Sequence, residues 1–254
     1  MEPNNNRSQF VTIPGAIIIA AAIIAVAIIY VFKPSSPTNT AKINTPQVPT
    51  VTMANVTSND HIFGNPNAPI KIVEFSDPSC PYCKMFNPTM EQIMSAYGAS
   101  GNVAWVYRSF PLDTPDSNGN ILHPNAGHEA QALECAASIG GNEKFWAYEK
   151  KWYDEFPLQG ATQRSIADDT KQLVDVATSV GLDASRFNDC LSSGQFKSKI
   201  QDQYTDGINA GVSGTPYSII ISPSGNKIPI AGAVSFATLK STIDALLSTT
   251  TVSQ

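Results

Sequence analysis

Two cysteines separated by two residues are the side chains in this sequence best suited to chemistry. Cys80 and Cys83 enclose the pair Pro81-Tyr82 and directly follow a short polar turn. A disulfide across such a gap closes easily on a helical turn, and its outer sulfur stays open to attack by another thiolate. The spacing therefore predicts a redox-active pair that exchanges disulfides with other molecules.

A zinc site is the main alternative for the same pair. Zinc would require two further ligands at a suitable spacing. The remaining cysteines are isolated from each other, and the histidines do not form a metal-binding pattern: Cys135, Cys190, His61, His123 and His128. We therefore favour redox chemistry and expect neither a metal nor a bound cofactor.

The residues around the pair predict a strand followed by a helix. Ile70–Phe75 is a short apolar run with β-branched residues, which is typical of a strand. From Cys80 onward, apolar residues spaced three and four apart predict a helix that ends near Gly98. Cys80 then lies at the helix start, where unpaired backbone N–H groups favour a thiolate. We expect Cys80 to be the nucleophile and Cys83, one turn further in, to be the more buried resolving thiol.

Glu74 is an acidic residue inside this otherwise apolar strand. If its side chain is buried, its pKa is raised and it can relay the proton of Cys83. The alternative is a glutamate near the strand end that faces solvent. We count Glu74 as a candidate catalytic residue.

The remaining elements place a block of helices between two groups of strands. We expect helices at 125–139, 144–156, 171–180, 183–191 and 196–210, strands at 103–110, 217–222 and 227–231, and a closing helix at 236–247. The strand at 227–231 contains a proline, so it should lie at a sheet edge. The order β-α-β, helices, β-β-α predicts an α/β thioredoxin fold with a helical domain inserted at about 120–210.

The N-terminal region predicts a membrane anchor. A tail at 1–12 precedes an apolar segment at 13–32, within which 16–32 carries no charge. At ~1.5 Å per residue, such a helix spans roughly 26–30 Å, which matches the hydrocarbon core of a bilayer. A cleaved signal peptide and a buried helix remain alternatives. Residues 33–58 are rich in Pro, Ser, Thr and Asn, so we expect a flexible linker to a folded domain at 59–248, followed by a tail at 249–254.

Charge and compartment narrow the possible partners. The net charge of −5 and the pI near 5.1 argue against nucleic-acid binding. Lysine and arginine lie on both sides of the apolar segment, so the positive-inside rule gives no orientation. We expect the domain outside the cytoplasm, as a single-pass cell-membrane protein, because a short tail before one span is the usual signal-anchor layout and disulfide chemistry requires an oxidising side.

Two motifs together resemble a known family. The segment from Gly64-Asn65-Pro66 through the strand to Cys80-Pro81-Tyr82-Cys83-Lys84, with Gly211–Pro216 far downstream, is similar to the DsbA-like family of thioredoxin-fold thiol:disulfide oxidoreductases. The resemblance covers roughly residues 58–248. It implies that Cys80 is the nucleophile, that Cys83 is its buried partner and that Glu74 matches an acidic position of the family.

The resemblance also assigns the substrate-binding residues. Pro216 matches a cis-proline that faces the disulfide, and Thr215 would offer backbone hydrogen bonds to an extended substrate peptide. Pro81 and Tyr82, between the cysteines, are further candidates for substrate contact. Some members carry a second, structural disulfide, which here would join Cys135 and Cys190 and could stabilise the fold by ~4 kcal/mol. Two buried free thiols are the alternative.

The expected function is dithiol oxidation of reduced secreted proteins by a monomeric enzyme. The resemblance implies reoxidation by a quinone-linked membrane oxidase of the DsbB or VKOR type. Pro81-Tyr82 stands where DsbA has Pro-His, and a threonine before the cis-proline, as Thr215 here, resembles the pattern of the Dsb isomerases. A reductase or isomerase is therefore the second hypothesis. A non-catalytic thioredoxin-like binding module is the third, which the intact cysteine pair disfavours.

Overall fold

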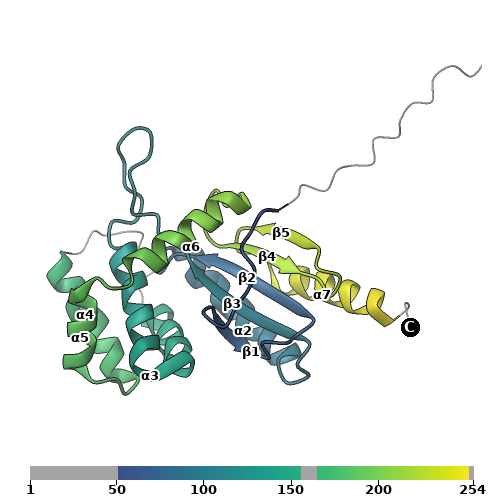
Figure 1. The fold of residues 1–254 in the computed structure, drawn as a ribbon, viewed down its shortest axis with the longest axis horizontal. Coiled ribbons are helices and arrows are strands. Elements are labelled where there is room, and N and C mark those ends of the chain that lie inside the picture. The colour runs from purple at the N-terminus through teal and green to yellow at the C-terminus, as the bar shows by residue number, and fades with distance from the viewer. Residues whose placement is uncertain (1–50, 156–164, 252–254) are drawn as a thin grey trace, which may run out of the picture. The chain divides into compact units, whose positions relative to one another are not determined.

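One five-stranded sheet organises residues 51–155 and 165–251, which the computed structural model describes (Figure 1). Its strands lie in the order β1 (His61–Gly64), β3 (Val103–Ser109), β2 (Ile70–Ser76), β4 (Tyr217–Ile221) and β5 (Lys227–Ala231). β2 and β3 run parallel, and all other neighbours are antiparallel. The two central strands are almost wholly buried, as expected when elements cover both faces of a sheet.

Alternation along β2 divides the core into two layers. Ile70 and Ile72 pack in a large cluster with apolar residues of α2 (Pro81–Tyr97) and α7 (Phe236–Thr251). Val73 and Phe75 face the other way and pack in a smaller cluster that includes the end of α6 (Lys197–Ala210). Since side chains alternate with a period of two, Glu74 belongs to the face covered by α2.

The predicted helical insertion is present. It comprises α3 (Ala126–Glu155), α4 (Ile166–Ser179) and α5 (Ala184–Ser193), which gather at one end of the domain in Figure 1. The backbone of Gly141, at φ 76° and ψ −172°, interrupts α3 and separates the two helices that the sequence predicted there. The aromatic residues of the second half are buried in the core: Phe145, Trp146, Tyr148, Trp152 and Tyr153.

The sheet edges match the prediction on one side only. β5, with Pro229, is an edge strand, as expected. The opposite edge is β1, which the sequence did not predict. It is four residues long and pairs only with β3, so it shows too little alternation to identify from the sequence.

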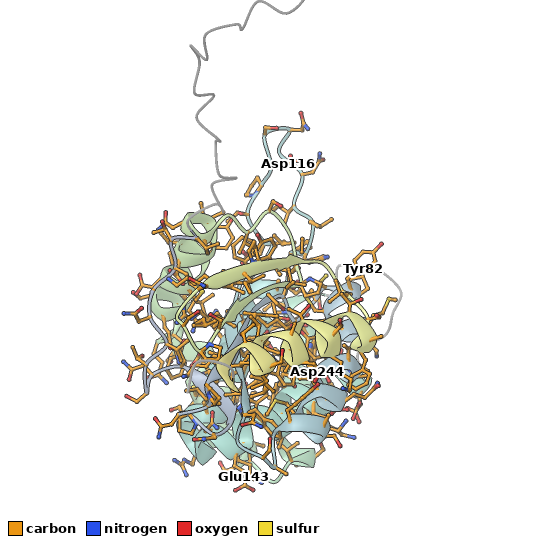
Figure 2. All side chains as sticks on the ribbon, turned by 90° about the vertical axis from the view of Figure 1, so that its right-hand side faces the viewer. Tyr82, Asp116, Glu143 and Asp244 are labelled. Atoms are coloured by element: carbon orange, nitrogen blue, oxygen red, sulfur yellow. A yellow bond between two sulfur atoms is a disulfide. The ribbon has the colours of Figure 1, made fainter. Side chains whose placement is uncertain are left out.

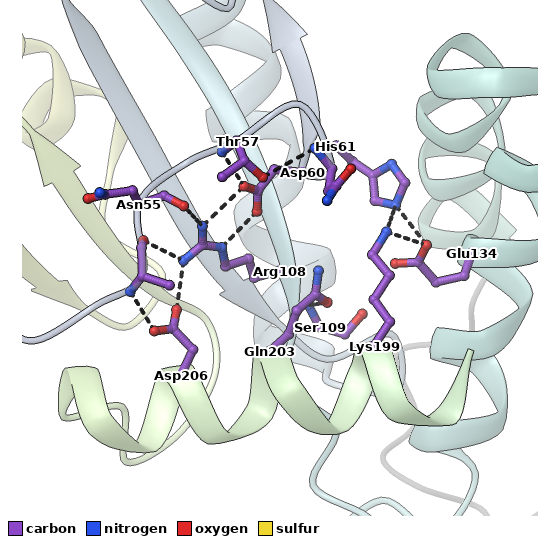
Figure 3. Close-up of polar contacts among 12 residues, drawn as sticks. Asn55, Thr57, Asp60, His61, Arg108, Ser109, Glu134, Lys199, Gln203 and Asp206 are labelled. Atoms are coloured by element: carbon purple, nitrogen blue, oxygen red, sulfur yellow. Dashed lines mark hydrogen bonds and ion pairs between the residues drawn. The ribbon is translucent and has the colours of Figure 1, made fainter. Parts of the chain in front are cut away.

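Near its end the predicted linker at 33–58 departs from the expectation, because Met53, Ala54 and Asn55 contact the folded domain. Met53 is 6% exposed and joins the smaller core cluster. The buried Arg108 guanidinium of β3 donates to the carbonyls of Ala54 and Asn55, at 3.1 and 3.2 Å (Figure 3). Hydrogen bonds to a distant arginine order this segment, although its own composition predicts no fixed structure.

Two carboxylates also pair with the Arg108 guanidinium. It also bonds to Asp60 at 2.8 Å and to Asp206 of α6 at 2.6 Å (Figure 3). The arginine therefore joins the segment before β1, the central sheet and α6.

No helix within 51–155 and 165–251 is long and apolar enough to cross a membrane. The predicted anchor at 13–32 lies outside the described residues, as do the tail at 1–12 and most of the predicted linker.

Candidate active site

The two cysteines lie where β2 passes into α2. Cys80 is the residue before the first helical turn, with φ −80° and ψ 121°, and Pro81 begins the helix. Proline fits there because the missing N–H has no partner in the first turn. Both cysteines are free thiols. Cys80 is only 3% exposed and Cys83 1%, so the nucleophile is more enclosed than the sequence predicted.

The two thiols have opposite electrostatic surroundings. Hydrogen bonding by Cys83 lowers the pKa of Cys80 from 9.0 to about 6, although burial acts in the other direction. Burial raises the pKa of Cys83 well above 9.0, and the nearby Cys80 and Glu74 raise it further. Near neutral pH the site therefore holds a thiolate at Cys80 and a thiol at Cys83, which is the division of roles that the sequence predicted.

The segment before β4 covers the outer cysteine. The peptide bond between Thr215 and Pro216 is cis, as predicted. Cys80 Sγ lies 3.4 Å from the Thr215 carbonyl oxygen, to which it donates only when protonated, and the Thr215 side chain helps to lower the pKa of Cys80. This contact brings together two motifs that lie far apart in the sequence and explains the low exposure of Cys80.

Glu74 is buried beneath the helix, so the solvent-facing alternative is wrong. It is 2% exposed, and the strand register places it between Tyr107 of β3 and Ser218 of β4. Trp105 Nε1 donates to its carboxylate at 2.9 Å. Burial raises the pKa of Glu74 from 4.5 to about 7, against the lowering effect of hydrogen bonds from Ser76 and Trp105. An acid with this pKa can exchange a proton near neutral pH, as a relay for Cys83 requires.

A second buried acid in the same layer was not predicted. Glu149 of α3 accepts a hydrogen bond from Asn87, which lies one turn after Cys83 on α2. Burial raises the pKa of Glu149 well above its ordinary value, and the charge of Glu74 contributes to this rise. Glu149 could not be recognised from the sequence, because it lies in a helix that contains several other charged residues.

The turn between β2 and Cys80 is also held by residues that the sequence did not single out. Asp77 is fully buried. Its carboxylate accepts from the backbone N–H groups of Ser79 and Leu112, at 2.7 and 2.8 Å, and from His123 Nδ1 at 2.7 Å. Because these partners come from separate segments, sequence spacing could not reveal them.

Two aromatic residues of the insertion hold the backbone of the same turn. Tyr153 donates from its hydroxyl to the Asp77 carbonyl at 3.1 Å, and Trp152 Nε1 donates to the Pro78 carbonyl at 2.9 Å. α3 thereby fixes the segment that places Cys80 at the start of α2.

Two large side chains on the first turns of α2 are exposed to solvent. Tyr82 is 61% exposed and projects from the molecule in Figure 2, and Met85 is similarly exposed. Pro81 is partly exposed. The substrate contacts expected for Pro81, Tyr82, Thr215 and Pro216 remain predictions.

The other two cysteines form the predicted structural disulfide. Cys135 of α3 and Cys190 of α5 are bonded, with their Cα atoms 5.8 Å apart. They are therefore not ligands for the zinc alternative. Within the described part of the chain, no group of three or more His, Cys, Asp and Glu side chains could hold a metal ion.

Comparison with known families agrees with this geometry. A family model described as Thioredoxin matches residues 56–245. The chain belongs to the thioredoxin family.

Solved structures place this thioredoxin-family chain among the DsbA folds. Oxidised BdbD from Bacillus subtilis is 20% identical with a TM-score of 0.64, covering 78% of this chain and 98% of that one. Wolbachia pipientis α-DsbA1 is 21% identical with a TM-score of 0.64 and coverages of 78% and 95%. Chlamydia trachomatis DsbA is 18% identical with a TM-score of 0.61 and coverages of 76% and 94%. The thioredoxin fold with its helical insertion is thus the DsbA fold.

Curated relatives match over shorter segments. The Na(+)/H(+) antiporter NhaA 1 of Mycolicibacterium gilvum is 33% identical over 87 residues, which are 34% of this chain and 12% of the antiporter. The antiporter NhaA 3 of Salinispora tropica is 29% identical over 157 residues, which are 62% of this chain and 21% of the antiporter. The chain therefore spans a small part of these relatives.

Proposed function

We propose that this chain is an extracytoplasmic thiol:disulfide oxidoreductase that oxidises pairs of thiols in reduced secreted proteins. The observation that carries the proposal is the Cys80 thiol with its pKa of about 6, beside a Cys83 thiol whose pKa is raised. Stabilising a thiolate stabilises the reduced enzyme, so the enzyme more readily accepts electrons from substrate thiols.

The size of this effect follows from the pKa. At pH 7 a shift from 9.0 to about 6 favours the reduced form about tenfold, or about 30 mV in a two-electron couple. The thiolate therefore makes the enzyme more oxidising by a modest step, and the remaining surroundings of the disulfide set the rest of its potential.

The reaction proceeds in two exchanges. A substrate thiolate attacks Cys80 in the Cys80–Cys83 disulfide, and Cys83 leaves and is protonated. A second substrate thiol, deprotonated, attacks the substrate sulfur of the mixed disulfide, and Cys80 leaves as a thiolate. The substrate gains a disulfide, the enzyme gains two electrons, and a membrane oxidase of the quinone-linked DsbB or VKOR type is the expected acceptor of those electrons.

Two features support an extracytoplasmic location. The Cys135–Cys190 disulfide suits an oxidising environment. The apolar segment at 13–32 would hold a monomeric domain at the membrane surface. Labelling of Cys80 in intact cells with a membrane-impermeant maleimide should succeed after mild reduction, and labelling only after lysis would refute this location.

Paired cysteine variants test the activity. Cys80→Ser should abolish oxidation of a reduced model protein. Cys83→Ser, given a disulfide-bonded model protein, should accumulate a mixed disulfide on Cys80, because Cys80 attacks the substrate disulfide and no Cys83 thiol is present to resolve the product. If neither change alters thiol oxidation, the chain is a binding module. A reduction potential near that of thioredoxin, ~−270 mV, instead of near that of DsbA, ~−120 mV, would favour the reductase or isomerase hypothesis.

A further inference from the structure

Asp77 connects a histidine to both cysteines of the redox pair. Its backbone N–H donates to Cys83 Sγ at 3.5 Å, and its carbonyl accepts from the Cys80 N–H at 3.0 Å. Its carboxylate accepts from His123 Nδ1 at 2.7 Å. His123 is itself buried, and it enters the site from the loop between β3 and α3.

We propose that His123 is the cation that balances the Cys80 thiolate in the reduced enzyme, and that it receives one of the two protons released by the substrate. The inference rests on the proposed dithiol oxidation. It gives His123 a positioning and charge-balancing role that the pair Pro81-Tyr82 does not provide, since neither of those residues carries a positive charge.

One carboxylate at the site opposes the Cys80 thiolate. The negative charge of Asp77 acts to raise the pKa of Cys80 and so disfavours the thiolate. A protonated His123, bonded to that carboxylate, cancels this effect. Reciprocally, burial lowers the pKa of His123, but Asp77 and the Cys80 charge outweigh burial and raise it.

Two further carboxyl groups lie near this turn. Asp113, on the same loop, interacts electrostatically with Asp77. Glu129 of α3 accepts the hydroxyl of Ser79, the residue before Cys80. Asp77 and the Cys80 thiolate are the two groups that favour a positive charge on the His123 imidazole.

The proton balance of the reaction agrees with this role. Two substrate thiols lose two electrons and two protons when they form a disulfide. The Cys80–Cys83 disulfide accepts both electrons, and Cys83 accepts one proton as it becomes a thiol. Cys80 remains a thiolate, so the second proton is available to His123, and the reduced site gains no net charge.

A pair of matched histidine variants tests the inference. His123→Gln keeps a donor for Asp77 but removes the charge. His128→Gln is the control, because His128 forms a similar Nδ1 bond to Asp169 at 2.8 Å and does not contact the CxxC turn in the bonds described. The Cys80 thiolate is followed by its absorbance at 240 nm during a pH titration of the reduced enzyme.

The thiol of His123→Gln should be a roughly 3- to 10-fold weaker acid than that of the unsubstituted enzyme, and His128→Gln should match the unsubstituted enzyme. Equal titrations of all three proteins would overturn the inference. A second measurement needs no variant: the NMR pKa of His123 should be higher in the reduced than in the oxidised protein, and identical values would also overturn it.

These outcomes separate the inference from the proposed function. If Cys80→Ser abolishes oxidation but His123→Gln leaves the thiolate unchanged, only the role of His123 fails. If the thiolate responds to His123 but the protein oxidises no dithiol, the proposed function fails and the charge pairing stands.

Discussion

Replacing Glu74 by glutamine should remove a pH-dependent destabilisation of the folded protein. The carboxyl has a pKa of about 7 when folded and 4.5 as its ordinary value. Below pH 4.5 it is protonated in both states and contributes nothing. Between pH 4.5 and 7 the unfolded chain loses this proton while the folded protein keeps it, so stability falls as pH rises. Above pH 7 the cost is constant, at about 3 kcal/mol.

Glutamine is the suitable replacement because it has the same shape and can still accept the hydrogen bond from Trp105 Nε1. Urea unfolding of the oxidised protein from pH 4 to 8 measures the effect, since the redox thiols then carry no proton. The difference in unfolding free energy between variant and unsubstituted protein should grow by about 3 kcal/mol in favour of the variant between pH 4 and 8. Glu91→Gln, at an exposed ion pair with Lys150, is the control and should show little pH-dependent difference.

A pH-independent difference between Glu74→Gln and the unsubstituted protein would refute this reasoning. It would mean that the carboxyl titrates normally despite its burial. The proposed relay of the Cys83 proton would then lose its physical basis, because an ordinary glutamate is ionised throughout the working range.

Three further changes have defined outcomes. Thr215→Val removes a hydroxyl that lowers the pKa of Cys80, so the Cys80 pKa, measured by thiolate absorbance, should rise with little loss of stability. An unchanged pKa would show that the hydroxyl does not interact with the sulfur. Arg108→Met leaves two partly buried carboxylates without their cation and should cost up to about 3–5 kcal/mol in urea unfolding. A loss below 1 kcal/mol would contradict a stabilising role for this network. Replacing Cys135 and Cys190 by alanine opens a loop with a sequence separation of 55 and should lower the free energy of unfolding by about 4 kcal/mol. The Cys80 pKa should not change, and a shifted pKa would show that the disulfide acts on the redox site.

The sequence predicted features that depend on local pattern. The strand, the turn and the helix start around Cys80 follow from apolar spacing and from Pro81, and Pro229 placed β5 at the sheet edge. The acid Glu74 was recognisable because it interrupts an apolar strand. The cis peptide before Pro216 and the second disulfide came only from family resemblance, since neither has a local signature.

Features that depend on distant partners were not predictable. Residues 51–58 have the composition of a linker, yet Arg108 orders them by hydrogen bonds from a strand far along the chain. The bond between Asp77 and His123 likewise joins two segments whose proximity is decided by the fold. A charged residue in a sequence shows that a charge is present, but only the tertiary structure shows whether it is buried and what it meets.

The hydrogen bonds from Trp152 and Tyr153 to the turn before Cys80 tie the helical insertion to the thioredoxin core. The insertion and the core therefore cannot change independently of each other. The helical insertion supplies part of the frame that aims the nucleophile, so excising it would leave a thioredoxin core with the right cysteines and a loosened catalytic turn. Substitutions in α3 should therefore affect thiol–disulfide exchange, although α3 lies far from Cys80 and Cys83 in the sequence. Redesign of this enzyme for a new substrate would have to vary the insertion and the residues around the redox pair together.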